Sequence, residues 1–176
     1  QPRSRGLGDV YKRQVMECSS SLAHVVIKEL TGQKLTIAAA ESLTAGLFCA
    51  TLASVPGASA VLRGGLVVYA TDLKHQLAGV STQTLQRVGA VAEDTARELA
   101  VGAKKQCGAD IGVGLTGVAG PTKQDGHPVG TVFIGVALPE IPVCVRQYHF
   151  TGSRQEIREQ SVSAALSLVH EHIQTQ

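Results

Sequence analysis

Aromatic residues are scarce in this sequence, which has no Trp, three Tyr and three Phe among its 176 residues. The core must therefore be built from Ala, Val, Leu and Ile, with the 19 Gly at turns and close packing points. The scarcity also removes the stacking platforms with which many proteins hold single-stranded nucleic acids. No apolar run reaches the ~20 residues that a membrane-spanning helix needs, so the sequence predicts no membrane segment.

Positive charge is concentrated in the first fourteen residues and is scarce elsewhere. Arg3, Arg5, Lys12 and Arg13 lie there against a single acidic residue, Asp9. The rest of the chain holds 12 basic and 13 acidic residues, a net charge of −1. Nucleic-acid-binding surfaces concentrate Lys and Arg to neutralise phosphates, so we expect no nucleic-acid partner.

The segment before Met16, the only Met of the chain, lacks the apolar periodicity of a helix or strand. We interpret residues 1–15 as a non-native or disordered extension and residues 16–176 as a single domain whose natural start is Met16. A transit peptide is the alternative, and we expect no secretory signal because the apolar segment of such a signal is missing. The length favours one domain with a core that needs no disulfide or metal.

Disulfide and metal-binding patterns are absent from the sequence. The four cysteines are far apart and include no C-x-x-C pair: Cys18, Cys49, Cys107 and Cys144. Reduced thiols in a cytoplasmic protein explain this spacing best. The six His do not cluster, and His170 and His172 point to different sides of a helix. We therefore expect neither a metal nor another cofactor.

Apolar patterns predict strands that alternate with helices early in the chain and a β-hairpin near its end. The predicted strands cover 35–39, 66–69, 110–115, 129–138 and 143–150. The predicted helices cover 17–31, 44–53, 72–79, 81–87, 91–107 and 153–172, with Ser81 and Ser153 as N-caps and Gly108 as a C-cap. This order predicts an α/β fold, a three-layer α/β/α sandwich with a mixed β-sheet.

Ser42 is the first candidate for chemistry, because it stands between a predicted strand end and a predicted helix start. Free backbone N–H groups and the positive end of the helix dipole converge at such a point, where they could hold an oxyanion. The alternative is that Ser42 is only a helix N-cap, as Ser often is. Glu41 either orients this turn or supports Lys74, and the sequence does not decide between the two.

Tyr69 and Lys74 form the second candidate, at the end of one predicted strand and in the first turn of the next helix. A Lys held near an apolar sheet edge can have a lowered pKa and act as a general base for Ser. The Tyr hydroxyl could share or relay the proton. The alternative is an edge Tyr with a solvated Lys.

Two further segments could bind a ligand. The turn Thr116–Pro121 is rich in small residues at a strand end, where the backbone can approach a ligand closely. Arg154 follows Gly152 and Ser153 at a helix N-terminus, a suitable place for a phosphate or carboxylate. The alternatives are an ordinary Gly-rich turn and a capped surface helix. Asp125 lies in a polar loop that we expect to be surface.

Together these segments resemble the C-terminal domain of the competence/damage-inducible protein CinA, a family that includes nicotinamide-nucleotide amidohydrolases. The matching motifs are AESLTAG at 40–46, Tyr69-x4-Lys74, GVSTQTL at 79–85, GAVAEDTA at 89–96, LTGVAGP at 115–121, PVGTVFIGVA at 128–137 and FTGSRQEIR at 150–158. The resemblance covers the chain from about Leu22 onward. It departs from the family at Leu43, where small or sulfur-containing residues are common, and at Ala45, where Gly is common, but no reactive group is lost.

The resemblance implies hydrolysis of the carboxamide of nicotinamide mononucleotide, without a metal, to nicotinic acid mononucleotide and ammonia. It implies Ser42 as the nucleophile, Lys74 as its base and Tyr69 as a proton-shuttling or positioning partner. Arg154 resembles the group that orients the nucleotide through its phosphate. The remaining residues implied to contact the substrate are Glu41, Thr44, Gly46, Thr116, Gly117 and Gly120.

The resemblance also suggests a homodimer or larger assembly, and the compact length favours a stand-alone enzyme. Because an unperturbed Lys has a pKa near ~10.4, this mechanism requires a pocket that lowers the pKa of Lys74. The alternative function is a non-catalytic nucleotide-binding or interaction domain. A third possibility is an amidase that acts on another small carboxamide.

Overall fold

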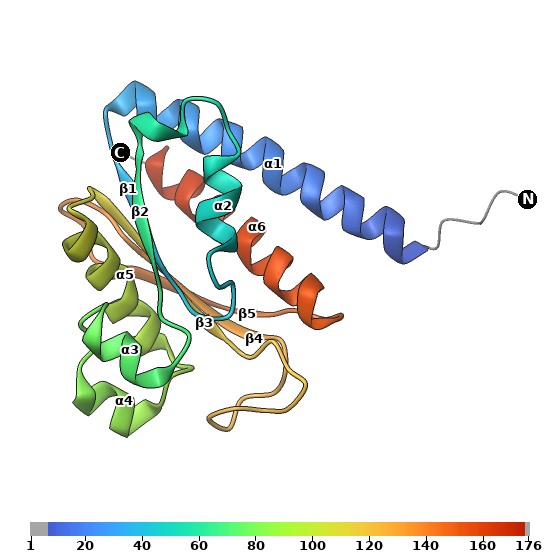
Figure 1. The fold of residues 1–176 in the computed structure, drawn as a ribbon, viewed down its shortest axis with the longest axis vertical. Coiled ribbons are helices and arrows are strands. Elements are labelled where there is room, and N and C mark those ends of the chain that lie inside the picture. The colour runs from blue at the N-terminus through green and yellow to red at the C-terminus, as the bar shows by residue number, and fades with distance from the viewer. Residues whose placement is uncertain (1–6, 175–176) are drawn as a thin grey trace, which may run out of the picture.

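A computed structural model describes residues 7–174, which form one five-stranded sheet with helices on both faces (Figure 1). The strand order is β2-β1-β3-β4-β5. The strands are β1 (Ile37–Glu41), β2 (Leu62–Val67), β3 (Ile111–Gly117), β4 (Thr131–Ala137) and β5 (Cys144–His149). The first three run parallel and the last two are antiparallel to their neighbours, so the sheet is mixed.

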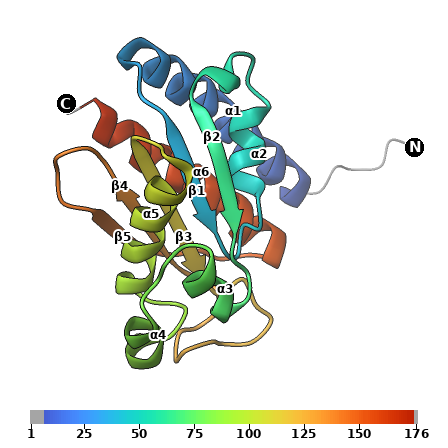
Figure 2. The same ribbon diagram turned by 60° about the vertical axis from the view of Figure 1, so that its left-hand side comes forward.

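The helices divide between the two faces of the sheet, as Figures 1 and 2 show. One face carries α1 (Leu7–Gln33), α2 (Leu47–Ala53) and α6 (Arg154–Ile173), which contact one another. The other carries α3 (Thr71–Gln76), α4 (Thr82–Val88) and α5 (Glu93–Cys107). A short 3₁₀ helix, η1 (Ala58–Ala60), links α2 to β2. The expected three-layer α/β/α sandwich with a mixed sheet is confirmed.

Small residues in the central strands let α5 pack closely on the sheet. A Cβ on Gly112 would lie 2.0 Å from the carbonyl oxygen of Ala100, and one on Gly114 would lie 2.4 Å from that of Ala96. Strand β1 is buried along its whole length between the two helical layers. The aliphatic core that the composition predicts is present, with Phe48 the only aromatic among its largest fully buried side chains.

Local signals in the sequence placed most element ends. Ser81 caps α4, and its hydroxyl accepts the N–H of Thr84. Gly108 ends α5 in the left-handed conformation, with φ 59°. Ser153 begins α6 with a reciprocal capping box, and β4 and β5 pair as the expected hairpin.

Several element boundaries differ from the sequence-based expectations, among them those of α1, β2 and α2. Helix α1 begins at Leu7, so residues 7–15 are helical. This corrects the expectation of no structure before Met16. Residues 1–6 lie outside the described part of the chain. Once the packed part of a helix has formed, each further residue adds one hydrogen bond, and no Pro interrupts this segment. Strand β2 ends at Val67, two residues before Tyr69, and α2 begins only at Leu47. No helix within residues 7–174 has the length and apolarity to cross a membrane.

The three parallel strands all end at the same edge of the sheet, and this edge carries the candidate site. Such an edge is where α/β sheets usually bind their ligands. Ser42 directly follows β1, Tyr69 follows β2, and the 116–121 turn begins at the end of β3. The fold thereby gathers segments that are far apart in the sequence.

Candidate active site

Ser42 lies in a turn of its own and not at the start of a helix. Its N–H donates to the carbonyl of Leu115 at 3.0 Å, and its own carbonyl accepts the N–H of Ala45 at 3.0 Å. The N-cap of α2 is Gly46, with φ 96°, and not Ser42. The alternative that Ser42 is a helix N-cap is therefore wrong, and its hydroxyl is left for another partner.

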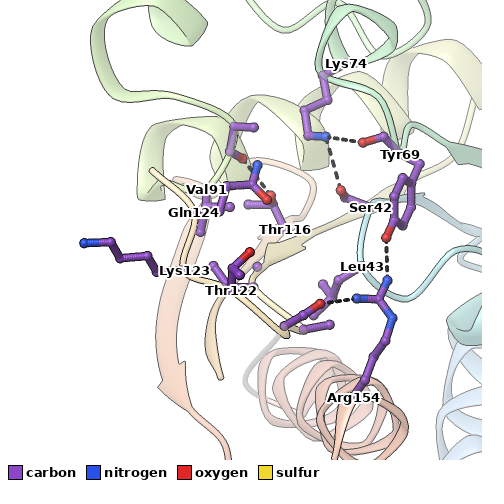
Figure 3. Close-up of a pocket in the computed structure, with 15 residues that line it drawn as sticks. Ser42, Leu43, Tyr69, Lys74, Val91, Thr116, Thr122, Lys123, Gln124 and Arg154 are labelled. Carbon is purple, nitrogen blue, oxygen red and sulfur yellow. Dashed lines mark hydrogen bonds between the residues drawn. The ribbon is translucent and has the colours of Figure 1, made fainter. Parts of the chain in front are cut away.

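That partner is Lys74, whose amine points from α3 toward the end of β1 (Figure 3). Its Nζ lies 3.1 Å from Ser42 Oγ, 2.9 Å from the Val68 carbonyl oxygen and 3.3 Å from the Tyr69 carbonyl oxygen. A neutral amine has two N–H donors and one lone pair. The two carbonyls can take the donors, and the lone pair can take the Ser42 proton.

The environment of Lys74 favours that neutral form. Only 1% of Lys74 is exposed. Burial lowers its pKa from 10.5 to about 8, although the negative charges of Asp125 and Asp72 act to raise it. Near pH 7.5 about a quarter of such an amine is neutral, compared with about one in a thousand at the ordinary value. The alternative of a solvated helix Lys is wrong, and the buried amine lies beside the Ser42 hydroxyl.

The Tyr69 side chain turns away from this pair. Its ring is 55% exposed, and its hydroxyl accepts a hydrogen bond from Nη2 of Arg154. Figure 3 shows the ring extending from the Lys74 side of the site down to Arg154. Only the backbone carbonyl of Tyr69 contacts Lys74. The structure thus brings Tyr69 into the site as a positioning group and does not place its phenol where it could relay the Ser42 proton.

A pocket of about 270 Å³ opens above Ser42 and Lys74. Residues 116–120 form one wall, including the sequence-predicted Thr116, Gly117 and Gly120. The Thr116 hydroxyl donates to the Ala90 carbonyl at 2.6 Å, so it fixes the neighbouring loop. Arg154 stands at the rim, where its Nη1 donates to the Gly120 carbonyl at 2.6 Å. These four residues lie together as the sequence predicts.

Three residues expected to contact substrate do not line this pocket: Glu41, Thr44 and Gly46. The Glu41 carboxylate is 1% exposed and accepts the N–H groups of Gly46, Phe48 and Cys49 at 3.0, 3.1 and 2.9 Å. It therefore caps the start of α2 from the preceding strand and orients the turn. The hydroxyl of Thr44 is buried without a hydrogen-bond partner in the described part of the chain.

Sequence reasoning missed several groups that complete the site. The loop before β4 is exposed, as expected. Its residues Thr122, Lys123 and Gln124 also line the pocket, which the sequence did not predict. Asp125 anchors this loop, because its carboxylate accepts the Val91 N–H at 2.9 Å. Their polar character gave no signal, since loop residues are polar in any case.

Arg158 was also missed, although it lies within the FTGSRQEIR motif. Its Nε and Nη2 donate to the carbonyls of Leu43 and Thr44, each at 2.9 Å. The spacing of four residues after Arg154 placed it on the same side of α6, which was the available signal. No group of three or more His, Cys, Asp or Glu suited to a metal ion occurs among residues 7–174.

Comparisons with known proteins agree with this geometry. The family described as CinA C-terminal domain matches residues 19–173. A competence-damage inducible protein of Lactiplantibacillus plantarum is 51% identical over 150 residues, which are 85% of this chain but 36% of that protein. The chain thus spans little more than a third of the length of this curated relative.

Solved structures match over nearly their whole length. The competence/damage inducible protein CihA of Agrobacterium tumefaciens has a TM-score of 0.85 at 33% identity, over 89% of this chain and 96% of that one. A CinA superfamily protein of Klebsiella pneumoniae has a TM-score of 0.86 at 27% identity, over 90% and 99%. The part of CinA that this chain matches is the C-terminal domain. The fold, the motifs and these matches agree that the chain belongs to the CinA family.

Proposed function

We propose that this chain is an amidohydrolase that converts nicotinamide mononucleotide and water to nicotinic acid mononucleotide and ammonia. The observation that carries the proposal is the contact between Ser42 Oγ and the buried amine of Lys74 at 3.1 Å. A Ser hydroxyl is a weak nucleophile unless an adjacent base takes its proton. Lys74, with a pKa near 8, supplies that base inside the pocket.

In the first step, Ser42 Oγ attacks the carboxamide carbon and its proton moves to Lys74. The negative charge then develops on the carboxamide oxygen and needs hydrogen-bond donors. The N–H groups of Ser42 and Ala45 are already bonded within the protein. The described residues provide no partner for the N–H group of Leu43, a residue that lines the pocket, and we assign it as a donor for this oxyanion.

In the second step, the C–N bond breaks and protonated Lys74 gives its proton to the departing ammonia. Water then attacks the acyl-enzyme, Lys74 takes the proton of that water, and Ser42 leaves as a hydroxyl. The amine is neutral again at the end of the cycle. Tyr69 holds Lys74 through its backbone carbonyl and takes no part in proton transfer.

Recognition of the nucleotide is proposed for the pocket rim, where Arg154 and Lys123 supply positive charge. Arg154 uses two of its five N–H donors on Gly120 and Tyr69, so others remain for a phosphate. The Gly117–Gly120 wall allows a flat ring to approach the backbone.

The test is ammonia release from nicotinamide mononucleotide by the purified protein, with the acid product measured by chromatography. We expect turnover by the unchanged protein and none by Ser42→Ala or Lys74→Arg, since Arg cannot give up its proton. Ser54→Ala, an exposed Ser at the end of α2, is the matched control and should keep full activity. Binding without turnover, unaffected by Ser42→Ala, would favour a non-catalytic nucleotide-binding domain.

A further inference from the structure

The Ser42 turn is held from one side by Arg158, which no substrate-binding role explains. Arg158 lies in the second turn of α6 and does not line the pocket. Its guanidinium bonds the carbonyls of Leu43 and Thr44, the two residues that follow Ser42, each at 2.9 Å. Gln155, one turn earlier, accepts its Nη1 at 2.8 Å and fixes the side chain. Arg158 therefore constrains the direction of two successive peptide groups.

Glu41 holds the same segment through backbone N–H groups, whereas Arg158 holds it through backbone carbonyls. Its buried carboxylate accepts three N–H groups that follow the turn, those of Gly46, Phe48 and Cys49. A cation thus bonds the carbonyls of the turn while an anion bonds the N–H groups at its end. Charge-assisted hydrogen bonds are about twice as strong as neutral ones, so this pair of residues fixes the backbone on which Ser42 stands.

The orientation of the Leu43 N–H group follows from this arrangement. In a trans peptide the C=O and the N–H point in opposite directions, and the only cis bond of the described chain is Gly120–Pro121. Because the Ser42 carbonyl points back to Ala45, the N–H of Leu43 points out of the turn. Arg158 holds the next two peptide groups by their carbonyls, so the turn that carries this N–H keeps its shape.

We propose that Arg158 is a positioning residue that, with Glu41, holds the turn after Ser42 so that the N–H group of Leu43 faces the developing oxyanion. The inference rests on the proposed amidohydrolase function, since it assigns this donor to the reaction of Ser42. Arg158 acts through the backbone and touches no substrate. It therefore affects the rate of the chemical step more than the binding of the nucleotide.

The test compares Arg158→Ala and Arg158→Lys with Arg146→Ala as the matched control. Arg146 also makes two bonds to a partner on α6, the carboxylate of Glu171, both at 3.0 Å, but lies on β5 outside the pocket. Three quantities are measured for each variant: kcat and KM for nicotinamide mononucleotide, the melting temperature, and the rate at which a fluorophosphonate labels Ser42.

The fluorophosphonate reports the oxyanion donor without an amide substrate. Ser42 Oγ forms a bond to phosphorus, its proton goes to Lys74, the P–F bond breaks and fluoride leaves. The phosphoryl oxygen occupies the position of the oxyanion, so its labelling rate depends on the same N–H group. Losing one such donor typically lowers a rate ~10²–10³-fold, and misdirecting it without removing it should cost about tenfold to a hundredfold.

We expect Arg158→Ala to lower kcat and the labelling rate together by about tenfold to a hundredfold, with KM within about threefold. Arg158→Lys should recover part of both rates, because one ammonium can bond one of the two carbonyls. Arg146→Ala should keep both rates.

An unchanged kcat in Arg158→Ala, or a loss confined to KM, overturns the proposal. The proposal is also overturned if the loss of activity in Arg158→Ala is fully explained by the fraction of unfolded protein and is not reduced in Arg158→Lys. If Ser42 is labelled but nicotinamide mononucleotide is not hydrolysed, the proposed substrate is wrong, and the labelling rates still decide the role of Arg158. If Ser42 is neither labelled nor active, the proposed function and this inference both fail.

Discussion

The buried amine of Lys74 should make both activity and stability depend on pH in a way that one substitution can isolate. Its pKa falls from 10.5 in the unfolded chain to about 8 in the folded protein, because burial disfavours the charged form. The unfolded chain therefore binds more protons between these two values. Stability contributed through Lys74 should rise with pH across that window.

The size of the effect follows from the shift. Each pKa unit corresponds to ~1.4 kcal/mol, so holding Lys74 in the fold costs about 3 kcal/mol below pH 8. Most of that cost is relieved by pH 10.5. Over the same range the neutral fraction of Lys74 increases, so kcat/KM should rise about tenfold per pH unit below 8 and level off above it.

The assay is urea-induced unfolding of the unchanged protein and of Lys74→Met at pH 7 and at pH 10.5. Met has a side chain of similar length that does not titrate. The contacts that Lys74 makes and Met cannot make therefore contribute equally to the stability difference at both pH values. We expect the unchanged protein to gain about 3 kcal/mol relative to Lys74→Met between them. A stability difference that does not change with pH, or a kcat/KM that falls as pH rises toward 8, would refute the assignment of Lys74 as a buried base.

Four further predictions concern single residues. Thr44→Val should raise the free energy of unfolding by about 1 kcal/mol and keep ammonia release, because the buried hydroxyl has no partner to lose; a loss of activity would show that this hydroxyl binds substrate. Arg154→Ala should raise KM for nicotinamide mononucleotide about tenfold or more while leaving KM for the unphosphorylated riboside within about twofold; equal effects on both would remove its phosphate role. Gly114→Ala should cost about 3 kcal/mol in thermal unfolding, because its Cβ would lie 2.4 Å from the Ala96 carbonyl oxygen. Gly32→Ala, where nothing lies within 4 Å in helix α1, should instead stabilise by about 1 kcal/mol.

The order of elements was predictable because its signals are local. Ser81, Gly108 and Ser153 satisfy the ends of helices through residues three or four positions away, so their roles are readable in a short window. The boundaries of α1 and β2 were less predictable. Helix propagation and strand pairing depend on neighbours that a short window does not contain.

The site was predictable in its residue types but not in its contacts. Ser42 and Lys74 were named through the family resemblance, and the structure places them in contact at 3.1 Å. The same motifs suggested a proton role for Tyr69 and a substrate role for Glu41. The structure turns the Tyr69 hydroxyl to Arg154 and gives the Glu41 carboxylate to the start of α2.

The sequence by itself therefore determined the layer order, the helix caps and the presence of a Ser and a Lys with a suitable spacing. Only the tertiary structure decided that Lys74 is buried, that Ser42 is not a helix cap, and that Arg158 holds the turn after it. The physical reason is distance along the chain. The pKa of Lys74 depends on all the groups that surround it, and Arg158 reaches Leu43 across 115 positions, so neither property exists until α3, α6 and the end of β1 are packed together.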